Sequence, residues 1–589
     1  MHRHLITTAD ESTWKLDCPV IFLGEWCRLY QRKKIWQHMD AIIADPYGLE
    51  LSKKDADYLD VCEIQKKIFP KLVKILNQHH KGAYTERFWL IVIGHWLERY
   101  VRMMINRIKT LEQCLQNHQI SGTLIHDVKD YSLVTQDSQA AIWSYGDDRW
   151  NNILSGRIID LLGYAQLITK ISPVFMPLAS HQKSIAERVT FKKILLWGWL
   201  NLTKILHRFV GENDAFMINT YLPKFVHFRV QLAFRQIPQY WSNPRLGLSA
   251  KVEIPLRKRL SENISCTSNE KIFEIINNML FEQLPICYLE GFNEINEYIE
   301  KLSWPKNPKF IFTSNSFDND EVFKIWTANK VEKGVRYVTG QHGNNYGTYR
   351  YNKPTIEEIT ADRFLTWGWK DGLVQHTPSF VLKTAGRNQE KSNKGGGLLL
   401  VQDMYYHRMD TWDRSAEYSQ IFSEQIKFIS NLFNDPYNKL TVRLHSSFVL
   451  NNPSESEMWG EIDPQIKVDR GDSHISTLIS KNRLIVYSYD STGILESLSQ
   501  NIPTLAFWQN GLEHLRDSAK QYYQALIEVG IVHLSPESAS QKVNEIWHDV
   551  EAWWSKPDVQ MARNIFCEVY AKKSENPVKD LRNILLAII

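Results

Sequence analysis

The spacing of hydrophobic residues divides the chain into three parts with different expected structures. Two short apolar runs near the start, His4–Thr8 and Val20–Gly24, each lead into a polar loop and are typical of buried strands. From about residue 55 to residue 290, apolar residues recur three and four apart, which indicates a mostly helical region. The clearest helices predicted there are Asp55–Asn77, Arg87–Leu115, Ile153–Ile171 and Lys192–Phe209.

Short apolar runs return after residue 305. Lys309–Ser314 and Val335–Thr339 read as two strands joined by a helix, for which Asp318 or Asn319 supplies the N-cap. Gly334 stands where a helix commonly ends. This is one strand–helix–strand unit, and its second strand runs into a glycine-bracketed loop.

Strands and helices alternate regularly after the polar, glycine-rich stretch Lys391–Gly397, which we interpret as a linker. The strands predicted there are Leu398–Val401, Leu440–Leu444, Ile466–Asp469, Leu484–Ser488, Thr504–Phe507 and Ile531–Leu534. The helices predicted there are Ala416–Phe433, His474–Ser480, Gly493–Ser499, Leu512–Glu528, Ser538–Trp554 and Val559–Lys573. Strands separated by single helices require right-handed crossovers and a mostly parallel sheet.

We therefore predict an α/β fold of two Rossmann-like lobes facing a cleft. Residues 1–390 would form an acceptor-side lobe with a large helical insertion at about 55–290, and residues 391–589 a nucleotide-binding lobe. A length of 589 residues exceeds what one hydrophobic core supports, which agrees with two large domains.

Composition and charge exclude several classes of protein. A net charge of +4 is too small for a protein that binds nucleic acid by neutralising many phosphates. The seven cysteines are dispersed, form no Cys-x-x-Cys pair and indicate reduced thiols in the cytoplasm. We find no secretory signal and no clean apolar span of about 20 residues. Peripheral contact with the inner face of the cytoplasmic membrane stays open.

Ligands of open parallel sheets bind beyond the carboxyl ends of the strands, so we examined the residues that follow each predicted strand. One strand ends in Arg443, Leu444, His445, Ser446 and Ser447, which together offer a cation, an imidazole and two hydroxyls. These groups suit the oxygens of a phosphate. A capped turn with a surface histidine is the alternative.

A second strand end carries a loop that opens a helix. Asp490, Ser491, Thr492 and Gly493 place hydroxyls and a glycine at the helix N-terminus, where free N–H groups and the helix dipole favour a phosphate. Glu496 lies one turn further on and is a candidate for binding ribose hydroxyls. In the alternative interpretation, the loop is a simple cap and Glu496 forms a salt bridge.

A histidine follows the strand that ends near residue 339. His342 has glycines on either side, so both its backbone and its imidazole can approach a ligand closely. Imidazole is the side chain best suited to take a proton near neutral pH, which makes His342 a candidate catalytic base. Its neighbours Gln341, Gly343, Asn344 and Tyr346 are candidate acceptor-side residues.

Carboxylates follow the first two strands. Asp10 and Glu11 come after the first, and Glu25 comes after the second, so each is a candidate base for an acceptor hydroxyl. Trp26 is placed to stack on a sugar. Glu290 is a weaker acceptor-side candidate, because it also suits a helix cap.

The remaining motifs give weaker evidence of function. Asp318-Asn319-Asp320 matches the DxD pattern of some metal-dependent glycosyltransferases, but a helix cap explains it more simply. The pair Asp147 and Asp148 is a further possible carboxylate site. No Gly-x-Gly-x-x-Gly, P-loop, His-Glu-x-x-His or Gly-x-Ser-x-Gly motif occurs, which argues against dinucleotide, ATPase, zinc-protease and serine-hydrolase functions.

The stretch Val486–Trp508 resembles the donor-binding region of GT-B-type transferases, in which a Ser/Thr-rich loop opens a helix with a Glu. With His342 in Gln-His-Gly and His445 in Arg-Leu-His, the chain is similar to the glycerophosphate and ribitol-phosphate polymerases of teichoic acid synthesis and to CMP-Kdo-using capsule transferases. Over nearly its whole length it resembles a family of transferases from bacterial surface-polysaccharide gene clusters. The segments that carry this likeness are Thr7–Trp14, Phe22–Cys27, Leu284–Phe292, Gly340–Gly347 and Asp490–Glu496.

The resemblance implies a metal-independent enzyme without a cofactor, whose nucleotide-activated donor is a substrate. His342 would be the base or an acceptor-side histidine, while His445, Ser491 and Thr492 would hold the donor phosphate. The chain departs from the polymerases in having Ser446 where they usually have proline. Its Gln-His-Gly also lacks the tryptophan typical of the teichoic enzymes, and both differences bear on the donor.

We therefore expect a glycosyltransferase that moves a sugar from a nucleotide donor to a glycan or lipid-linked acceptor of the cell surface, such as a polysaccharide or lipopolysaccharide. One alternative is a phosphotransferase that uses a CDP-alcohol. Another, from a different class, is a non-catalytic scaffold of a polysaccharide assembly complex.

Overall fold

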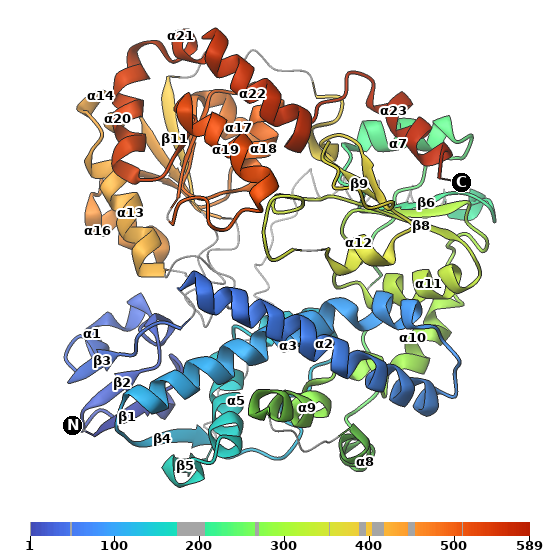
Figure 1. The fold of residues 1–589 in the computed structure, drawn as a ribbon, viewed down its shortest axis with the longest axis vertical. Helices are drawn as coiled ribbons and strands as arrows, with labels where there is room; N and C mark the ends of the chain where they lie inside the picture. Colours follow the sequence, from blue (N-terminus) through green and yellow to red (C-terminus); the bar gives the residue numbers. More distant parts are fainter. Residues whose placement is uncertain are drawn as a thin grey trace, which may run out of the picture.

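The computed structural model describes residues 2–47, 50–172, 207–244, 246–264, 270–352, 354–387, 396–402, 418–445, 454–508 and 510–588. Within these ranges the strands form three sheets, and every hydrogen-bonded pair of strands is parallel. Helices surround the sheets (Figure 1). The predicted α/β class is confirmed, with three parallel sheets where the sequence predicts two lobes.

The first sheet is built from the N-terminal third of the chain. Its strands are β1 (Arg3–Ile6), β2 (Val20–Phe22), β3 (Ala41–Ile43), β4 (Ile120–His126) and β5 (Ile168–Ile171). They lie in the order β3-β2-β1-β4-β5, so the chain runs outward to one side of β1 and then returns to its other side. The residues after β1 and β4 consequently meet at the switch point, where sheets of this kind bind ligands.

The second sheet lies in the middle of the chain. Its strands are β6 (Phe216–Ile218), β7 (Phe310–Thr313), β8 (Arg336–Gly340), β9 (Arg363–Thr366) and β10 (His376–Pro378), in the order β10-β9-β8-β7-β6. β7 and β8 match the predicted strand–helix–strand unit. The N-cap of the intervening helix is Asp320, whose side chain accepts from the N–H of Phe323 at 3.0 Å, and not Asp318 or Asn319. Asp318 instead pairs with Arg99.

The third sheet matches the predicted C-terminal alternation strand by strand. Its strands are β11 (Gly397–Val401), β12 (Leu440–Arg443), β13 (Lys467–Asp469), β14 (Asn482–Tyr487), β15 (Thr504–Phe507) and β16 (Val532–His533). Their order is β13-β12-β11-β14-β15-β16, which puts the switch point between β11 and β14. The predicted linker lies outside the described residues except for its last two positions.

Helices fill the space around the three sheets. Those that precede the third sheet are α1 (Lys33–Trp36), α2 (Leu51–His80), α3 (Glu86–Asn117), α4 (Ser138–Ser144), α5 (Asp148–Leu161), α7 (Lys224–Ala233), α8 (Ile254–Ile264), α9 (Lys271–Gln283), α10 (Phe292–Ile299), α11 (Glu321–Glu332) and α12 (Ile356–Thr360). Those of the C-terminal part are α13 (Tyr418–Ser430), α14 (Asn434–Asn438), α16 (Glu455–Ile462), α17 (Ile475–Lys481), α18 (Thr492–Ser499), α19 (Asp517–Glu528), α20 (Pro536–Ile546), α21 (Val550–Trp554), α22 (Pro557–Tyr570) and α23 (Pro577–Leu586).

The described part of the region from 55 to 290 contains long helices, as predicted, and also the strands β4, β5 and β6. The predicted helix Ile153–Ile171 is wrong in its second half, because α5 ends at Leu161 and residues 168–171 form β5. Gly163, with a φ of +92°, adopts a conformation that commonly terminates helices. The predicted helix Lys192–Phe209 lies outside the described residues apart from its last three positions.

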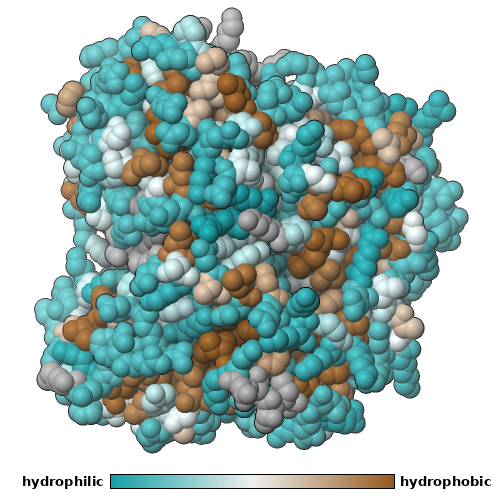
Figure 2. Space-filling model, viewed as in Figure 1, coloured by the Kyte–Doolittle hydropathy of each residue, from teal (hydrophilic) through white to brown (hydrophobic). Residues whose placement is uncertain are grey.

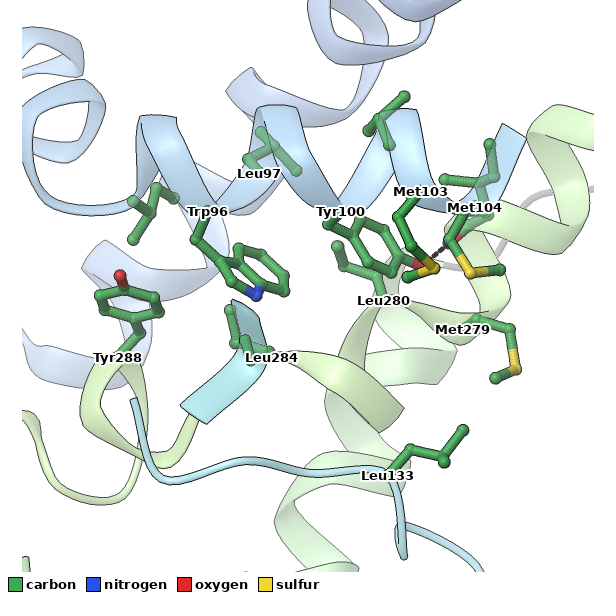
Figure 3. Close-up of a cluster of buried hydrophobic side chains, with 14 of the residues drawn as sticks. Trp96, Leu97, Tyr100, Met103, Met104, Leu133, Met279, Leu280, Leu284 and Tyr288 are labelled. Atoms are coloured by element: carbon green, nitrogen blue, oxygen red, sulfur yellow. Dashed lines mark hydrogen bonds between the residues drawn. The ribbon is translucent and has the colours of Figure 1, made fainter. Parts of the chain in front are cut away.

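The helix α3 connects the first two sheets. It is about 48 Å long at 1.5 Å per residue, and Thr85 caps its start by accepting from the N–H of Phe88. Most of its residues are buried, and most of these buried residues are apolar. Figure 3 shows its side chains packed against those of α9 and the segment that follows. The labelled residues of α3 are Trp96, Leu97, Tyr100, Met103 and Met104, which face Met279, Leu280, Leu284 and Tyr288.

The second sheet is covered on both faces, and its outer cover includes the last helix of the chain. Met217, Phe312 and Val338 pack with side chains of α7 and α23 in one core cluster. After the third sheet, the chain returns to the second sheet and ends in α23. The returning segment runs beside the one that led from the second sheet to the third. The N–H of Val381 donates to the carbonyl of Lys572 at 2.8 Å, so the outgoing and returning segments are joined directly.

No helix within the described ranges is long and apolar enough to cross a membrane. The six cysteines in these ranges are free thiols.

Buried histidines predict how the stability of the fold depends on pH. Burial lowers the pKa of His95 to about 3 and the pKa of His227 and His533 to about 4. Below pH 6.5 the unfolded chain therefore binds protons that the folded chain does not. The free energy of unfolding should fall by about 1.4 kcal/mol per pH unit for each such histidine between pH 6.5 and 4.

Urea denaturation at pH 7.5 and pH 5 measures this dependence. The variant His227→Gln should show a shallower decrease than the unmodified chain. An equal decrease in both proteins would contradict the assignment of His227 as a buried neutral group.

Candidate functional site

The loop after β8 is held by the side chain of Gln341. Its Oε1 accepts from the N–H of Trp367 at 2.9 Å and from Nε1 of Trp369 at 2.8 Å, and its Nε2 donates to the carbonyl of Gly343 at 2.9 Å. Gln341 is fully buried, so the amide shapes the turn and does not face a ligand. This role differs from the acceptor contact that the sequence suggested.

The same loop is bonded to the third sheet. The backbone N–H of Asn344 donates to Oγ1 of Thr492 at 3.0 Å, and its Nδ2 donates to Oδ1 of Asp490 at 2.8 Å. A Cβ atom on Gly343 would come within 2.9 Å of the Thr492 hydroxyl, so glycine permits this close approach. The loops after β8 and β14, which belong to different sheets, therefore meet.

Asp490 anchors this contact. Besides Asn344, its carboxylate oxygens accept from Nε2 of His514 at 3.1 Å and from the hydroxyl of Tyr523 at 3.2 and 3.3 Å. A carboxylate that already accepts from three side chains also carries the wrong charge for a phosphate. We conclude that Asp490 positions the loop after β8.

The N-terminus of α18 adjoins Asp490. Ser491 is the N-cap residue, but its side chain makes no capping hydrogen bond, and its buried Oγ has no partner among the described residues. Its residue surface is 2% exposed. A Cβ on Gly493 would lie 2.4 Å from the ring of Tyr487, so this glycine is required for packing. A hydroxyl and N–H groups that lack partners at a helix start suit a bound anion.

Arg443 and the Asp490 loop flank the same strand. Val401 of β11 pairs in register with Arg443 of β12 on one side and with Tyr487 of β14 on the other. Neighbouring strands lie about 4.8 Å apart, so the Cα atoms of Arg443 and Tyr487 are about 10 Å apart. Both residues stand at the carboxyl ends of their strands. The Nε of Arg443 is buried without a hydrogen-bond partner in the described chain. His445 is partly buried just beyond, whereas Ser446 and Ser447 lie outside the described residues.

His342 is partly exposed at the end of β8. Its Nδ1 lies 3.1 Å from the hydroxyl of Tyr346, and its ring packs near those of Phe317 and Tyr221, with centroids 5.8 and 6.0 Å away. Burial lowers its pKa to about 4, and the nearby cation Lys383 acts in the same direction. His342 is therefore neutral near pH 7, the form that can accept a proton.

Two ion pairs near His342 were not found from the sequence. Arg99 of α3 pairs with Asp318, and although burial opposes ionisation, this arginine lowers the pKa of Asp318 to about 2. Lys383 pairs with Glu496 of α18 at 2.9 Å. The salt-bridge interpretation of Glu496 thus describes the structure. No local motif marks Arg99 or Lys383, because the fold brings them in from distant segments.

The candidates of the first sheet lie at its own carboxyl edge. Asp10 accepts from Nε2 of His126 on β4 at 2.7 Å, across the switch point. Glu11 pairs with Arg32 at 2.8 Å, and both oxygens of Glu25 accept from Arg28 at 2.7 and 2.8 Å.

Trp26 follows Glu25 in this edge, and its Nε1 donates to the carbonyl of Thr7 at 3.1 Å. Burial raises the pKa of Asp148, which accepts from the N–H of Ala9 at 3.1 Å, to about 7. The first sheet thus has a polar edge of its own.

Glu290 lies inside the protein. Both of its oxygens accept from Arg257 at 2.6 Å, and Arg257 also donates to the carbonyls of Phe281 and Leu284. The two charged side chains are 0% and 2% exposed. Removing one partner of such a pair leaves an uncompensated buried charge, so we assign Glu290 to the stability of the fold.

Residues 3–585 of the chain match the LIC12162 family transferase, and the chain belongs to that family. No curated protein sequence matches it.

Three solved structures are distantly similar to the chain. The wall teichoic acid polymerase TagF is 11% identical with a TM-score of 0.31, over 50% of this chain and 84% of that one. MurG from Acinetobacter baumannii is 10% identical with a TM-score of 0.33, over 64% and 99%. The pneumococcal O-GlcNAc transferase GtfA, in complex with UDP and GlcNAc, is 10% identical with a TM-score of 0.32, over 50% and 59%.

The anchoring role of Asp490 predicts a loss of stability in the variant Asp490→Ala. The substitution leaves Asn344, His514 and Tyr523 without their acceptor, which should cost about 2–4 kcal/mol in the free energy of unfolding. Urea denaturation measures this cost. The exposed Asp472→Ala is the matched control and should change stability by less than about 0.5 kcal/mol. Equal stability of both variants would rule out the anchor.

Proposed function

We propose that this transferase is a GT-B-type glycosyltransferase, which moves a sugar from a nucleotide-activated donor to a growing cell-surface polysaccharide or lipopolysaccharide. Membership of a transferase family supports the reaction class. The observation that carries the proposal is the bonding of Asn344 to Asp490 and Thr492. It brings His342, two residues before Asn344, beside a helix N-terminus suited to phosphate.

In this mechanism Nε2 of His342 takes the proton of an acceptor hydroxyl. The acceptor oxygen then bonds to the anomeric carbon of the donor sugar as the bond from that carbon to the phosphate oxygen breaks. Negative charge builds on the departing nucleotide phosphate. Arg443, His445 and the Ser491–Thr492 turn would stabilise that charge.

We prefer His342 to the carboxylates of the first sheet as the base. Glu11 and Glu25 are paired with arginines, and Asp10 accepts from His126. A carboxylate that is held by a neighbouring side chain is less free to turn toward an acceptor hydroxyl. We assign the polar edge of the first sheet to the acceptor, with Trp26 as a neighbouring aromatic surface.

The reaction as proposed uses no cofactor and no bound metal ion, since protein groups oppose the charge of the phosphate. Full activity in the presence of EDTA would support this, and loss of activity that Mg²⁺ or Mn²⁺ restores would overturn it.

A nucleotide screen tests the donor. Thermal unfolding is measured with CMP, CDP, UDP, GDP and dTDP, because a ligand of the folded state at a hundred times its Kd adds about 2.7 kcal/mol. We expect one nucleotide to raise the melting temperature in the unmodified protein. The variant Ser491→Ala, which removes the hydroxyl and adds no atom to this buried site, should weaken that effect. Absence of a shift with all five nucleotides would refute the donor site.

Substitution of His342 tests the base. His342→Ala should lower kcat by roughly 10²–10⁴-fold, the range for general-base catalysis, while nucleotide binding persists. His38→Ala, at an exposed histidine, is the control. Normal glycan synthesis by a folded His342→Ala variant would favour a non-catalytic scaffold. Formation of CMP and a phosphodiester from CDP-glycerol would identify a CDP-alcohol phosphotransferase instead.

We also propose that the protein works at the inner face of the cytoplasmic membrane, where lipid-linked acceptors are found. Residues 215–252 contain five Lys or Arg and no Asp or Glu. On α7 within this stretch, Phe225 is 71% and Leu232 58% exposed, beside the exposed Lys224 and Arg229. Figure 2 shows hydrophobic and hydrophilic atoms side by side where α7 and α23 lie. Such a surface suits anionic lipid.

Vesicle binding tests this surface. The double variant Phe225→Ser with Leu232→Ser should bind anionic phospholipid vesicles at least tenfold more weakly, because each buried side chain contributes about 1.5–3 kcal/mol. The control is Met561→Ser with Ile565→Ser on α22, which removes two exposed apolar side chains elsewhere on the surface. Similar binding by both double variants would exclude α7 as the contact.

A further inference from the structure

Three side chains form a continuous hydrogen-bonded chain behind the exposed face of His342. The hydroxyl of Tyr346 lies 3.1 Å from Nδ1 of His342 and is also bonded to Oε1 of Glu357, at the start of α12. Tyr346 is 6% and Glu357 4% exposed, so water has little access to the two inner members. Only His342 reaches the surface, and its Nε2 is the nitrogen turned away from Tyr346.

The proton of the Tyr346 hydroxyl can satisfy only one of its two neighbours. When Glu357 is ionised, Tyr346 donates to the carboxylate and accepts from Nδ1–H of His342, which leaves a lone pair on Nε2. When Glu357 is protonated, its O–H donates to Tyr346, Tyr346 donates to Nδ1, and the ring proton stands on Nε2. The tautomer of His342 is thus tied to the charge of Glu357.

We propose that Tyr346 and Glu357 form a relay, a pair of positioning residues that switch Nε2 of His342 between a proton acceptor and a proton donor. The proposal rests on the proposed function of His342 as the base. With Glu357 ionised, the nitrogen that faces the acceptor hydroxyl is free to take its proton. With Glu357 neutral, the same nitrogen carries a proton and cannot act as the base.

The surroundings of Glu357 bring its pKa into a range in which the folded protein can be studied. Burial raises the pKa of Glu357 to about 8, and the neighbouring Glu358 acts in the same direction. On the side of α3, Nε2 of His95 lies 3.7 Å from Oε2 of Glu357, and burial keeps His95 neutral. Tyr346 keeps its proton throughout, because burial raises its pKa well above 10.

The charged groups that act on His342 are held in ion pairs of their own. Asp318 stays ionised beside Arg99, and Lys383 pairs with Glu496. A change in the reactivity of neutral His342 between pH 7 and 9 would therefore report on Glu357.

Diethyl pyrocarbonate tests the tautomer without a donor or an acceptor, because it acylates an imidazole nitrogen only through its lone pair. The rate of modification of His342 is measured by peptide mass spectrometry from pH 6.5 to 9.5, relative to the exposed His38 in the same sample. In the unmodified protein the relative rate should rise about tenfold between pH 7 and 9, as a group with a pKa near 8 ionises.

Two variants and one control complete the experiment. Glu357→Gln and Tyr346→Phe should each abolish the rise, because the first cannot ionise and the second breaks the chain. Tyr337→Phe also removes one buried tyrosine hydroxyl, but that hydroxyl has no hydrogen-bond partner among the described residues. This control should keep the rise. With a sugar donor built on the nucleotide that the screen identifies, Glu357→Gln and Tyr346→Phe should each lose about 10–100-fold in kcat with little change in KM.

The outcomes separate this proposal from the proposed function. If the rate of His342 acylation in the protein without substitutions does not depend on pH, the relay is overturned. The same follows if the rise survives in both variants. A confirmed rise together with an active His342→Ala variant would leave the relay standing and refute His342 as the base. An inactive His342→Ala variant with full activity in Tyr346→Phe and Glu357→Gln would keep the base and reject the relay.

Discussion

The structure depends on one contact, in which the loop after β8 is pinned to the third sheet through Asp490. Asn344 supplies the bond, and the chain that follows extends it: the backbone carbonyls of Tyr349 and Asn352 accept from Arg516, and Arg350 pairs with Asp55 of α2. A single segment of the second sheet thereby touches the third sheet and the long helices. The position of His342 follows from this arrangement, because it stands between Gln341 and Asn344, whose hydrogen bonds hold the turn.

Much of the third sheet could be predicted from the sequence. Thr504–Phe507 was predicted with the bounds that β15 has, because a short apolar run directly after Pro503 leaves little alternative. The same reasoning failed at β5, where Thr169 and Lys170 are exposed at a sheet edge and the run resembles the end of a helix. The separation of the first two sheets could not be predicted, because it depends on pairing between strands that are distant in the sequence. Local periodicity carries no information on that pairing.

The candidate site was less predictable, for a physical reason. A polar residue after a strand can face a ligand or can hold its own loop, and the two uses have the same local sequence. Gln341 and Asp490 were expected to contact substrate and instead hold loops, while Glu290 neutralises a buried arginine. Conversely Arg99 and Lys383 stand in ordinary helical and turn contexts. Only the assembled fold shows that they flank His342.

The hydrogen bond between Val381 and Lys572 bears on how the third sheet can move. The polypeptide leaves the second sheet and returns to it through two adjacent segments, and α23 then fastens the returning end. Two neighbouring tethers act as a hinge line, so swivelling about a single axis is the motion that strains them least. Sliding of one unit along the other would stretch both tethers. Movement about that axis would also have to break the bonds from Asn344 to Asp490 and Thr492, so those bonds resist separation of the two sheets.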